Sequence, residues 1–224
     1  MADDRKDDLR LLYGLCAQAS RFSSSYLLLR RKGYEREATA VARSAFEHAV
    51  TTPWVYFTAG GINRFKVDVT RDFQSYYDHM SDYLKNQDLR ETAKALQVPK
   101  GKGLPPFTDM MRDLDEGAFP LTAYKNLSQS VHPAHLTVST NLEVDGDGIK
   151  LRNKHRVVIP YPPLFEAAQS STLAMSLLRY MIDPNEAVAT LDKPSNSLLL
   201  PLFLHQVLPA AKRRKFSVSE VHGD

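Results

Sequence analysis

Cysteine is almost missing from this chain of 224 residues, which contains only Cys16. A single cysteine excludes an intramolecular disulfide and fits a reducing compartment. Cys16 lies in the apolar stretch 11–17, so we interpret it as a buried structural thiol, because a reactive thiolate needs exposure and a neighbouring cation. A chain of this length can bury about 70% of its unfolded surface. We therefore expect a fold that needs neither disulfides nor a structural metal.

The chain also has no long hydrophobic run. Its longest apolar stretch, near residues 198–204, contains Pro201 and is too short to span a bilayer. The N-terminus is rich in aspartate and lacks the basic start and apolar run of a signal peptide. These absences predict a cytoplasmic protein that does not bind a membrane.

A large excess of one charge is absent as well. The chain has 29 basic and 26 acidic residues, a net charge of +3, far from the basic face of a dedicated nucleic-acid-binding protein. The exception is the run Lys212, Arg213, Arg214 and Lys215. These four residues are candidates for nucleic-acid binding. The alternative, which we favour, is that residues 211–224 form a basic, flexible, solvated tail, because chain ends are commonly loose.

Several catalytic motifs are missing. The sequence has no G-x-S-x-G elbow, no G-x-G-x-x-G after a strand, no H-E-x-x-H, no E-x-x-H and no Walker loop, and it therefore lacks the usual signatures of serine hydrolases, dinucleotide enzymes, zinc proteases, di-iron proteins and P-loop enzymes. His132 and His135 are separated by Pro133, which breaks the helix that would align them on a metal. We expect neither a metal site nor a cofactor.

Helical periodicity is what the sequence does contain. Apolar residues recur at spacings of three and four in segments 4–32, 35–57, 63–97, 108–116, 120–132 and 164–182. Pro53 is expected to kink the second helix or to end it early. The third segment carries an aromatic-rich stripe, which we interpret as core packing rather than as a base-stacking platform: Phe65, Val69, Phe73, Tyr76, Tyr77, Met80, Tyr83 and Leu84.

The period changes after residue 134. Segments 135–144 and 149–159 are rich in β-branched residues and flank Asp145-Gly146-Asp147-Gly148, a strong tight-turn signal. The prediction is a single mainly α domain over residues 1–210, a helical bundle of about six helices with one β-hairpin inserted near 135–159.

Three ionisable residues lie within the second predicted helix. Arg43 and Glu47 are four residues apart and share a face, whereas His48 is about 140° around the helix from Arg43. A buried network of such charges can simply fix helix register, although buried ion pairs often add little net stability.

A second polar set lies at helical spacing in segment 120–132. Tyr124, Ser128 and His132 follow one another at intervals of four residues. If this helix packs on the second helix, these side chains meet the Arg43–His48 segment and form a candidate site. Tyr124 and Ser128 are its candidate ligand-binding residues.

Two resemblances bear on this site. Arg43 and His48 fit the R-x(4–6)-H pattern and resemble the HEPN superfamily. Segments 42–48 and 124–133 together resemble an uncharacterised family of bacterial helical proteins, with an arginine-and-glutamate helix and a later Y-x-x-L-S-x-x-x-H helix. The resemblance to this uncharacterised family extends over roughly residues 10–180. The HEPN resemblance implies a helical bundle, often a homodimer, of a bacterial defence or toxin-type system, with RNA as a possible partner.

The resemblance implies a metal-independent endoribonuclease as one function. Arg43 would then clamp the scissile phosphate through its planar donor fork. His48 would act as acid or base and His132 as the second proton-transfer group, while Glu47 would orient an imidazole.

Two other functions stay open. The first is a non-enzymatic interaction or sensor module with a protein partner, in which the Arg43, Glu47 and His132 cluster is structural or binds a small ligand. The second is another enzyme, acting on a nucleotide or a small metabolite at the same cluster.

Overall fold

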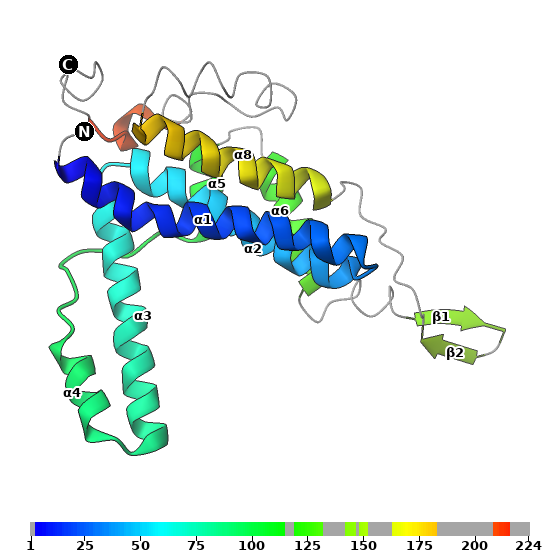
Figure 1. Cartoon of the computed structure of the whole chain (residues 1–224), viewed down its shortest axis with the longest axis horizontal. Helices are drawn as coiled ribbons and strands as arrows, with labels where there is room; N and C mark the ends of the chain where they lie inside the picture. Colours follow the sequence, from blue (N-terminus) through cyan, green and yellow to red (C-terminus); the bar gives the residue numbers. More distant parts are fainter. Residues whose placement is uncertain are drawn as a thin grey trace.

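Seven α-helices and one β-hairpin form most of what the computed structural model describes, which is residues 3–114, 119–131, 142–146, 148–151, 163–182 and 208–215. The predicted mainly α bundle with one hairpin is confirmed (Figure 1). The helices are α1 (Asp3–Arg31), α2 (Glu35–Phe57), α3 (Gly61–Leu84), α4 (Gln87–Ala95), α5 (Phe107–Leu114), α6 (Phe119–Val131) and α8 (Pro163–Ile182). The strands are β1 (Leu142–Asp145) and β2 (Gly148–Leu151), and a 3-10 turn, η1 (Ala210–Lys212), follows near the C-terminus.

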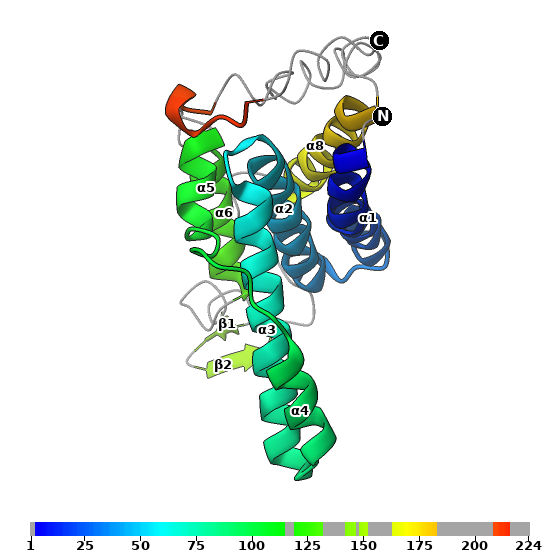
Figure 2. The ribbon, with the colours of Figure 1, turned by 90° about the vertical axis from the view of Figure 1, so that its left-hand side faces the viewer.

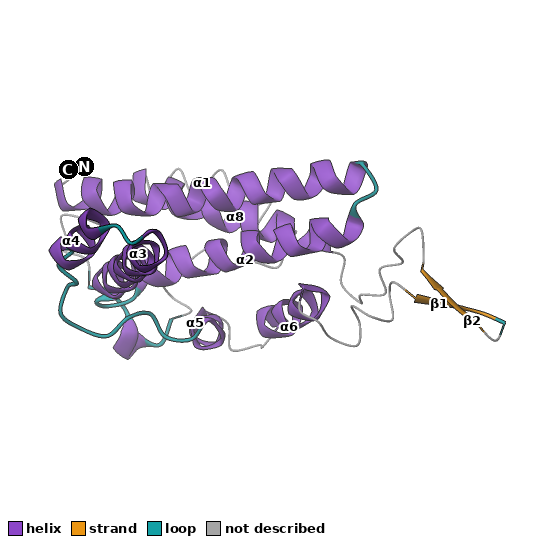
Figure 3. Cartoon of the chain, turned by 90° about the horizontal axis from the view of Figure 1, so that it is seen from below, coloured by secondary structure: helices purple, strands orange, loops and turns teal. Residues whose placement is uncertain are grey.

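Helix α2 lies in the middle of the bundle. It packs on α1 and α8, which also pack on each other, while α5 and α6 contact it from the other side (Figure 3). Small residues line its packing face, so neighbouring helices approach closely. These alanines are completely buried: Ala38, Ala42, Ala45 and Ala49.

Cys16 belongs to this core. Its side chain on α1 is fully buried, and burial raises the pKa of the thiol to about 12. The thiol therefore stays protonated near neutral pH, and its interpretation as a structural residue is confirmed.

Pro53 does not end α2. The helix continues to Phe57. Of the two outcomes predicted for Pro53, a kink or an early end, the early end is therefore excluded, and the residues around the proline explain why. Pro53 and its neighbours Thr52 and Trp54 are all buried in α2, so tertiary packing stabilises the last turns. The Thr52 hydroxyl also donates a hydrogen bond to the His48 carbonyl at 2.6 Å.

The segment predicted as one helix over 63–97 forms two. Helix α3 ends at Leu84, Lys85 has a left-handed φ of 51°, and α4 begins after Asn86. The Asn86 side chain caps α4 by accepting from the backbone N–H groups of Asp88 and Leu89, as N-cap asparagines do. The α3–α4 hairpin, residues 61–95, projects from the bundle as an arm (Figures 1 and 2).

The corner between α2 and α3 depends on a glycine. A Cβ atom at Gly61 would collide with the backbone carbonyl of Val55. The first turn of α3 can therefore lie directly against α2, and this contact sets the direction in which the arm leaves the bundle.

The predicted β-hairpin is present, with short strands where the structure describes them. β1 and β2 pair antiparallel in the register Val144 to Ile149, and Gly146 adopts the positive φ of 60° that the turn requires. The remainder of the predicted hairpin segment lies outside the described residues.

The basic run after residue 211 packs on the bundle where the structure describes it. Lys212 Nζ contacts Asp113 Oδ1 at 2.7 Å, and Arg214 Nη1 contacts Asp8 Oδ2 at 2.6 Å. Thr58 also forms a β-bridge with Arg213. Lys212 and Arg213 are exposed, as we expected for a solvated segment, but Lys212 and Arg214 are attached to the bundle by acidic partners distant in sequence. Residues 216–224 lie outside the described part.

None of the helices that the structure describes combines the length and the apolar character needed to cross a bilayer.

Candidate functional site

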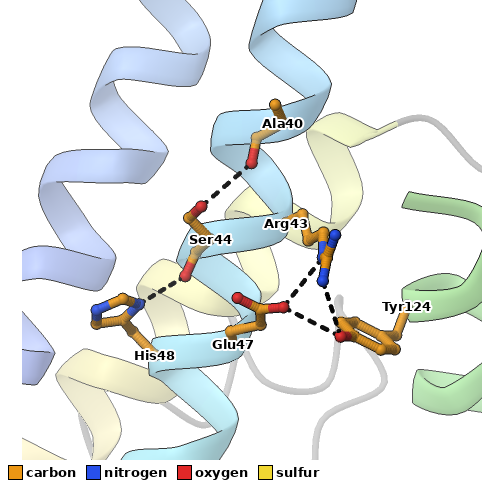
Figure 4. Close-up of polar contacts among 6 residues, drawn as sticks. All are labelled: Ala40, Arg43, Ser44, Glu47, His48 and Tyr124. Atoms are coloured by element: carbon orange, nitrogen blue, oxygen red, sulfur yellow. Dashed lines mark hydrogen bonds and ion pairs between the residues drawn. The ribbon is translucent and has the colours of Figure 1, made fainter. Parts of the chain in front are cut away.

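Helices α2 and α6 pack together and bring three of the candidate residues into contact (Figure 4). Arg43 Nε donates a hydrogen bond to Glu47 Oε1 at 3.0 Å. Arg43 Nη2 donates to the Tyr124 hydroxyl at 3.1 Å, and that hydroxyl donates to Glu47 Oε1 at 3.1 Å. The three side chains therefore form a closed triangle, which we call the α2–α6 triad.

The aromatic ring of Tyr124 contributes to the triad. Arg43 Cζ lies 5.2 Å from the ring centroid, within cation–π range. Burial alone lowers the pKa of Arg43, but the Tyr124 hydrogen bond and the charge of Glu47 outweigh burial and raise it. Phe107 of α5 packs on the same ring at 4.7 Å. The guanidinium is thus held by groups of its own chain, as in a structural ion pair.

His48 lies on a different face of α2. Its Nδ1 is 2.8 Å from the Ser44 carbonyl oxygen, and its ring packs edge-on against Phe22 of α1 at 5.4 Å. Figure 4 shows the imidazole directed away from Arg43 and Glu47. Because a carbonyl oxygen only accepts, Nδ1 is the donor in this contact. Arg43 and His48 of one chain therefore do not face a common site.

Ser128 does not join the triad. It lies one turn beyond Tyr124 on α6, and its hydroxyl is buried without a hydrogen-bond partner among the described residues. His132 lies outside the described residues, so its position relative to the triad stays a prediction.

The four basic candidates are largely committed to contacts. Lys212 and Arg214 form the ion pairs given above, Arg213 Nε donates to the Leu208 carbonyl at 2.7 Å, and Lys215 is exposed. Arg214 Cζ also lies 5.4 Å over the Tyr56 ring. Two of the four positive charges are thus neutralised by aspartates of the bundle.

The described part of the chain contains no cluster of side chains suited to a metal ion. There, no three His, Cys, Asp or Glu side chains come together in a way that would hold a metal ion.

The aromatic stripe of α3 is the feature that sequence reasoning placed wrongly. We predicted core packing, but four of its side chains are more than half exposed: Phe73, Tyr76, Tyr83 and Leu84. Among the described residues, three of the five exposed aromatic side chains are on this helix. The stripe is rich in tyrosine rather than leucine, and this composition was the available signal, because tyrosine is common on interaction surfaces.

Comparison with known proteins identifies the family of the chain. A family model described as a family of unknown function (DUF5677) matches residues 9–149, which is more than half of the sequence. No curated protein and no solved structure matches the chain. By the extent of the family match, the chain belongs to the family of unknown function DUF5677.

Proposed function

We propose that this protein is a non-enzymatic interaction module that works as a homodimer, joined through the aromatic stripe of its arm. The observation that carries the proposal is the solvent-exposed stripe on α3. Large apolar surface on a soluble fold is a common mark of a binding surface.

The stripe has the geometry of a helix-packing face. Phe73, Tyr76, Met80, Tyr83 and Leu84 fall within about 100° of one another at 100° per residue. A different face of α3 is directed toward α4. On that face Ser81 is buried, and the Gln74 side chain donates a hydrogen bond to the Ala93 carbonyl of α4. Packing on α4 therefore leaves the stripe uncovered.

The charge of the arm favours a second copy over a nucleic acid. Residues 71–94 contain four basic and five acidic side chains, so their net charge is close to zero. A phosphate backbone would gain little from such a surface. Two identical arms would not repel each other, and a two-fold axis places the same stripe on both sides of the interface. Two hairpins joined in this way form a four-helix bundle.

The test is the oligomeric state of the full chain, measured by light scattering after size-exclusion chromatography over a range of concentrations. The Phe73→Ser/Tyr76→Ser/Tyr83→Ser variant removes the stripe. The matched control is Tyr13→Ser, since Tyr13 on α1 is 59% exposed and Tyr76 is 57% exposed. We expect a dimer for the wild type and the control, and a monomer for the triple variant. A monomeric wild type, or a triple variant that stays dimeric, contradicts the proposal.

The metal-independent endoribonuclease is the alternative proposal. In its favour, the Arg43 and Glu47 side chains keep 18% and 35% exposure. His48 faces α1 instead, so Arg43 and His48 of one chain do not share a site, and His48 would have to meet the Arg43 of another copy. Incubation of total RNA with wild type and with Arg43→Ala/His48→Ala, each with and without EDTA, decides between the proposals. Cleavage by the wild type alone, unaffected by EDTA, would support the ribonuclease; the absence of cleavage supports the interaction module.

A further inference from the structure

A pocket of about 540 Å³ lies between the end of α2, the start of α3, α5 and the C-terminal segment. Its volume falls within the range of small-molecule sites. Trp54, Thr58 and Arg64 line one side of it, and the α5 residues Asp109, Arg112 and Asp113 line another, with Lys212 beside them. The pocket is separate from both the α2–α6 triad and the aromatic stripe.

The acidic groups of the pocket already have partners. Arg112 Nη1 contacts Asp109 Oδ1 at 2.7 Å. Asp113 accepts from Lys212 Nζ at 2.7 Å and from the indole N–H of Trp54 at 3.0 Å. Each carboxylate is therefore compensated by a cation of the pocket wall, and neither is left to attract an external cation.

Arg64 is the remaining charge. Its Cζ lies 5.9 Å over the Trp54 ring, and it forms no ion pair with any residue that the structure describes. Three basic and two acidic side chains line the pocket, so Arg64 accounts for an excess of one positive charge. A guanidinium with its donors uncommitted binds carboxylate or phosphate oxygens with two parallel hydrogen bonds.

Thr58 closes one side of the pocket. It is 5% exposed and its hydroxyl is itself buried, so this side chain shapes the wall of the pocket and leaves ligand contacts to Arg64. Its backbone is also satisfied: the N–H donates to the Trp54 carbonyl at 3.0 Å, and the carbonyl accepts from Gly61 N at 2.9 Å.

The start of α3 adds to the positive potential. Ala59 and Arg64 on either side of its first turn line the pocket, and the cap residue Gly60 has no side chain to bind the first N–H groups. The positive end of a helix dipole favours an anion at this position.

We propose that this pocket binds a small oxyanion, a molecule bearing a phosphate or a carboxylate group, with Arg64 as its ionic partner. This site does not depend on dimerisation through the arm, so its test and the test of the proposed function can fail separately.

The single tryptophan of the chain provides the readout, because Trp54 lines the pocket. Purified full-length protein is titrated at constant ionic strength with inorganic phosphate, ribose 5-phosphate and succinate, and with ribose as the neutral control. Tryptophan emission and isothermal calorimetry are recorded for each. We expect saturable binding of a phosphate or of succinate, which also identifies the recognised group, and none of ribose. The absence of saturable binding for all three oxyanions overturns the proposal.

Variants then assign the binding to this pocket. Arg64→Gln is expected to weaken binding at least tenfold, whereas Arg71→Gln, the same change two turns further along α3, leaves the affinity unchanged. Equal affinities for Arg64→Gln and the wild type overturn the proposal. If circular dichroism shows that Arg64→Gln does not fold, Arg64→Lys decides, because lysine keeps the charge but lacks the paired donors of a guanidinium: weaker binding by threefold or more supports the site, and unchanged binding overturns it.

Discussion

Helices α2 and α3 have almost the same length but very different surroundings. The 23 residues of α2 include 13 buried ones, whereas the 24 residues of α3 include only Gly61, Val67 and Ser81. Helix α2 contacts α1, α3, α5, α6 and α8, while α3 packs on α4 and on α2. Both helices carry a periodic apolar stripe, so the stripe alone does not determine burial; the number of neighbouring helices does.

The composition of the two stripes matches their surroundings. Alanine covers the packing face of α2, and small side chains allow several helices to approach at once. Aromatic side chains cover the stripe of α3, and they provide a large contact area for a single partner. The bundle therefore explains stability, and the arm is where we place the interaction.

The largest expected effect concerns the burial of aromatic side chains in the two regions. Phe46→Ala on α2 removes a ring that is 2% exposed and should lower the free energy of unfolding by about 3–5 kcal/mol. Tyr76→Ala on α3 should change it by less than about 0.5 kcal/mol. Urea denaturation at low protein concentration, where association does not contribute, measures both. Similar losses for the two variants would contradict the comparison.

The second prediction compares a buried carboxyl group with an exposed one. Glu166 on α8 is 1% exposed, and burial raises its pKa from 4.5 to about 7. Between these values the unfolded chain releases the proton while the folded chain keeps it, so the free energy of unfolding falls as pH rises from about 4.5 to about 7.

Glu166→Gln removes this dependence. The variant should be more stable than the wild type by up to about 3 kcal/mol at pH 8 and no more stable at pH 4. Glu91 on the arm is exposed, so Glu91→Gln is the control for the same substitution on the surface. Thermal or urea unfolding across this pH range is the measurement, and a pH-independent difference for Glu166→Gln would contradict the assignment.

The smallest expected effect compares the polar contacts of the part-buried α2–α6 triad with an exposed ion pair of the arm. Tyr124→Phe removes both hydrogen bonds of its hydroxyl in the α2–α6 triad and should cost about 1–2 kcal/mol. Asp82→Asn breaks the exposed Asp82–Arg90 pair of the arm and should cost less than about 1 kcal/mol.

A double-mutant cycle sharpens this prediction. Arg43→Gln combined with Tyr124→Phe should show a coupling free energy of about 1 kcal/mol. Additive losses would mean that the triad does not stabilise the contact between α2 and α6.

Sequence reasoning predicted the main helices because their signals are local. The helix over 35–57 was placed at the bounds of α2. The first helix, predicted over 4–32, ends at Arg31, just before Gly33 with its positive φ of 84°. The break between α3 and α4 was missed, although Asn86 followed by Asp88 is an N-cap signal of the same local kind.

The contacts of the candidate site were predicted in part. Arg43 and Glu47 share a helical face by spacing alone, and the structure confirms their ion pair. The Tyr124 contact depended on the packing of α6 against α2, which spacing within one helix cannot show. The pocket was missed for the same reason. Trp54 and Asp113 are in contact but 59 residues apart in the sequence, and Asp113 and Lys212 are in contact but 99 residues apart.

The sequence by itself determined the bounds of most helices, the hairpin turn and the faces on which side chains lie, because these depend on residues within one or two turns. Only the tertiary structure decided which apolar stripe is buried, that Lys212 and Arg214 bind Asp113 and Asp8, and that Arg43 meets Tyr124. Burial and ion pairing depend on which distant segments become neighbours, and the short-range periodicity of a helix carries no information about that choice.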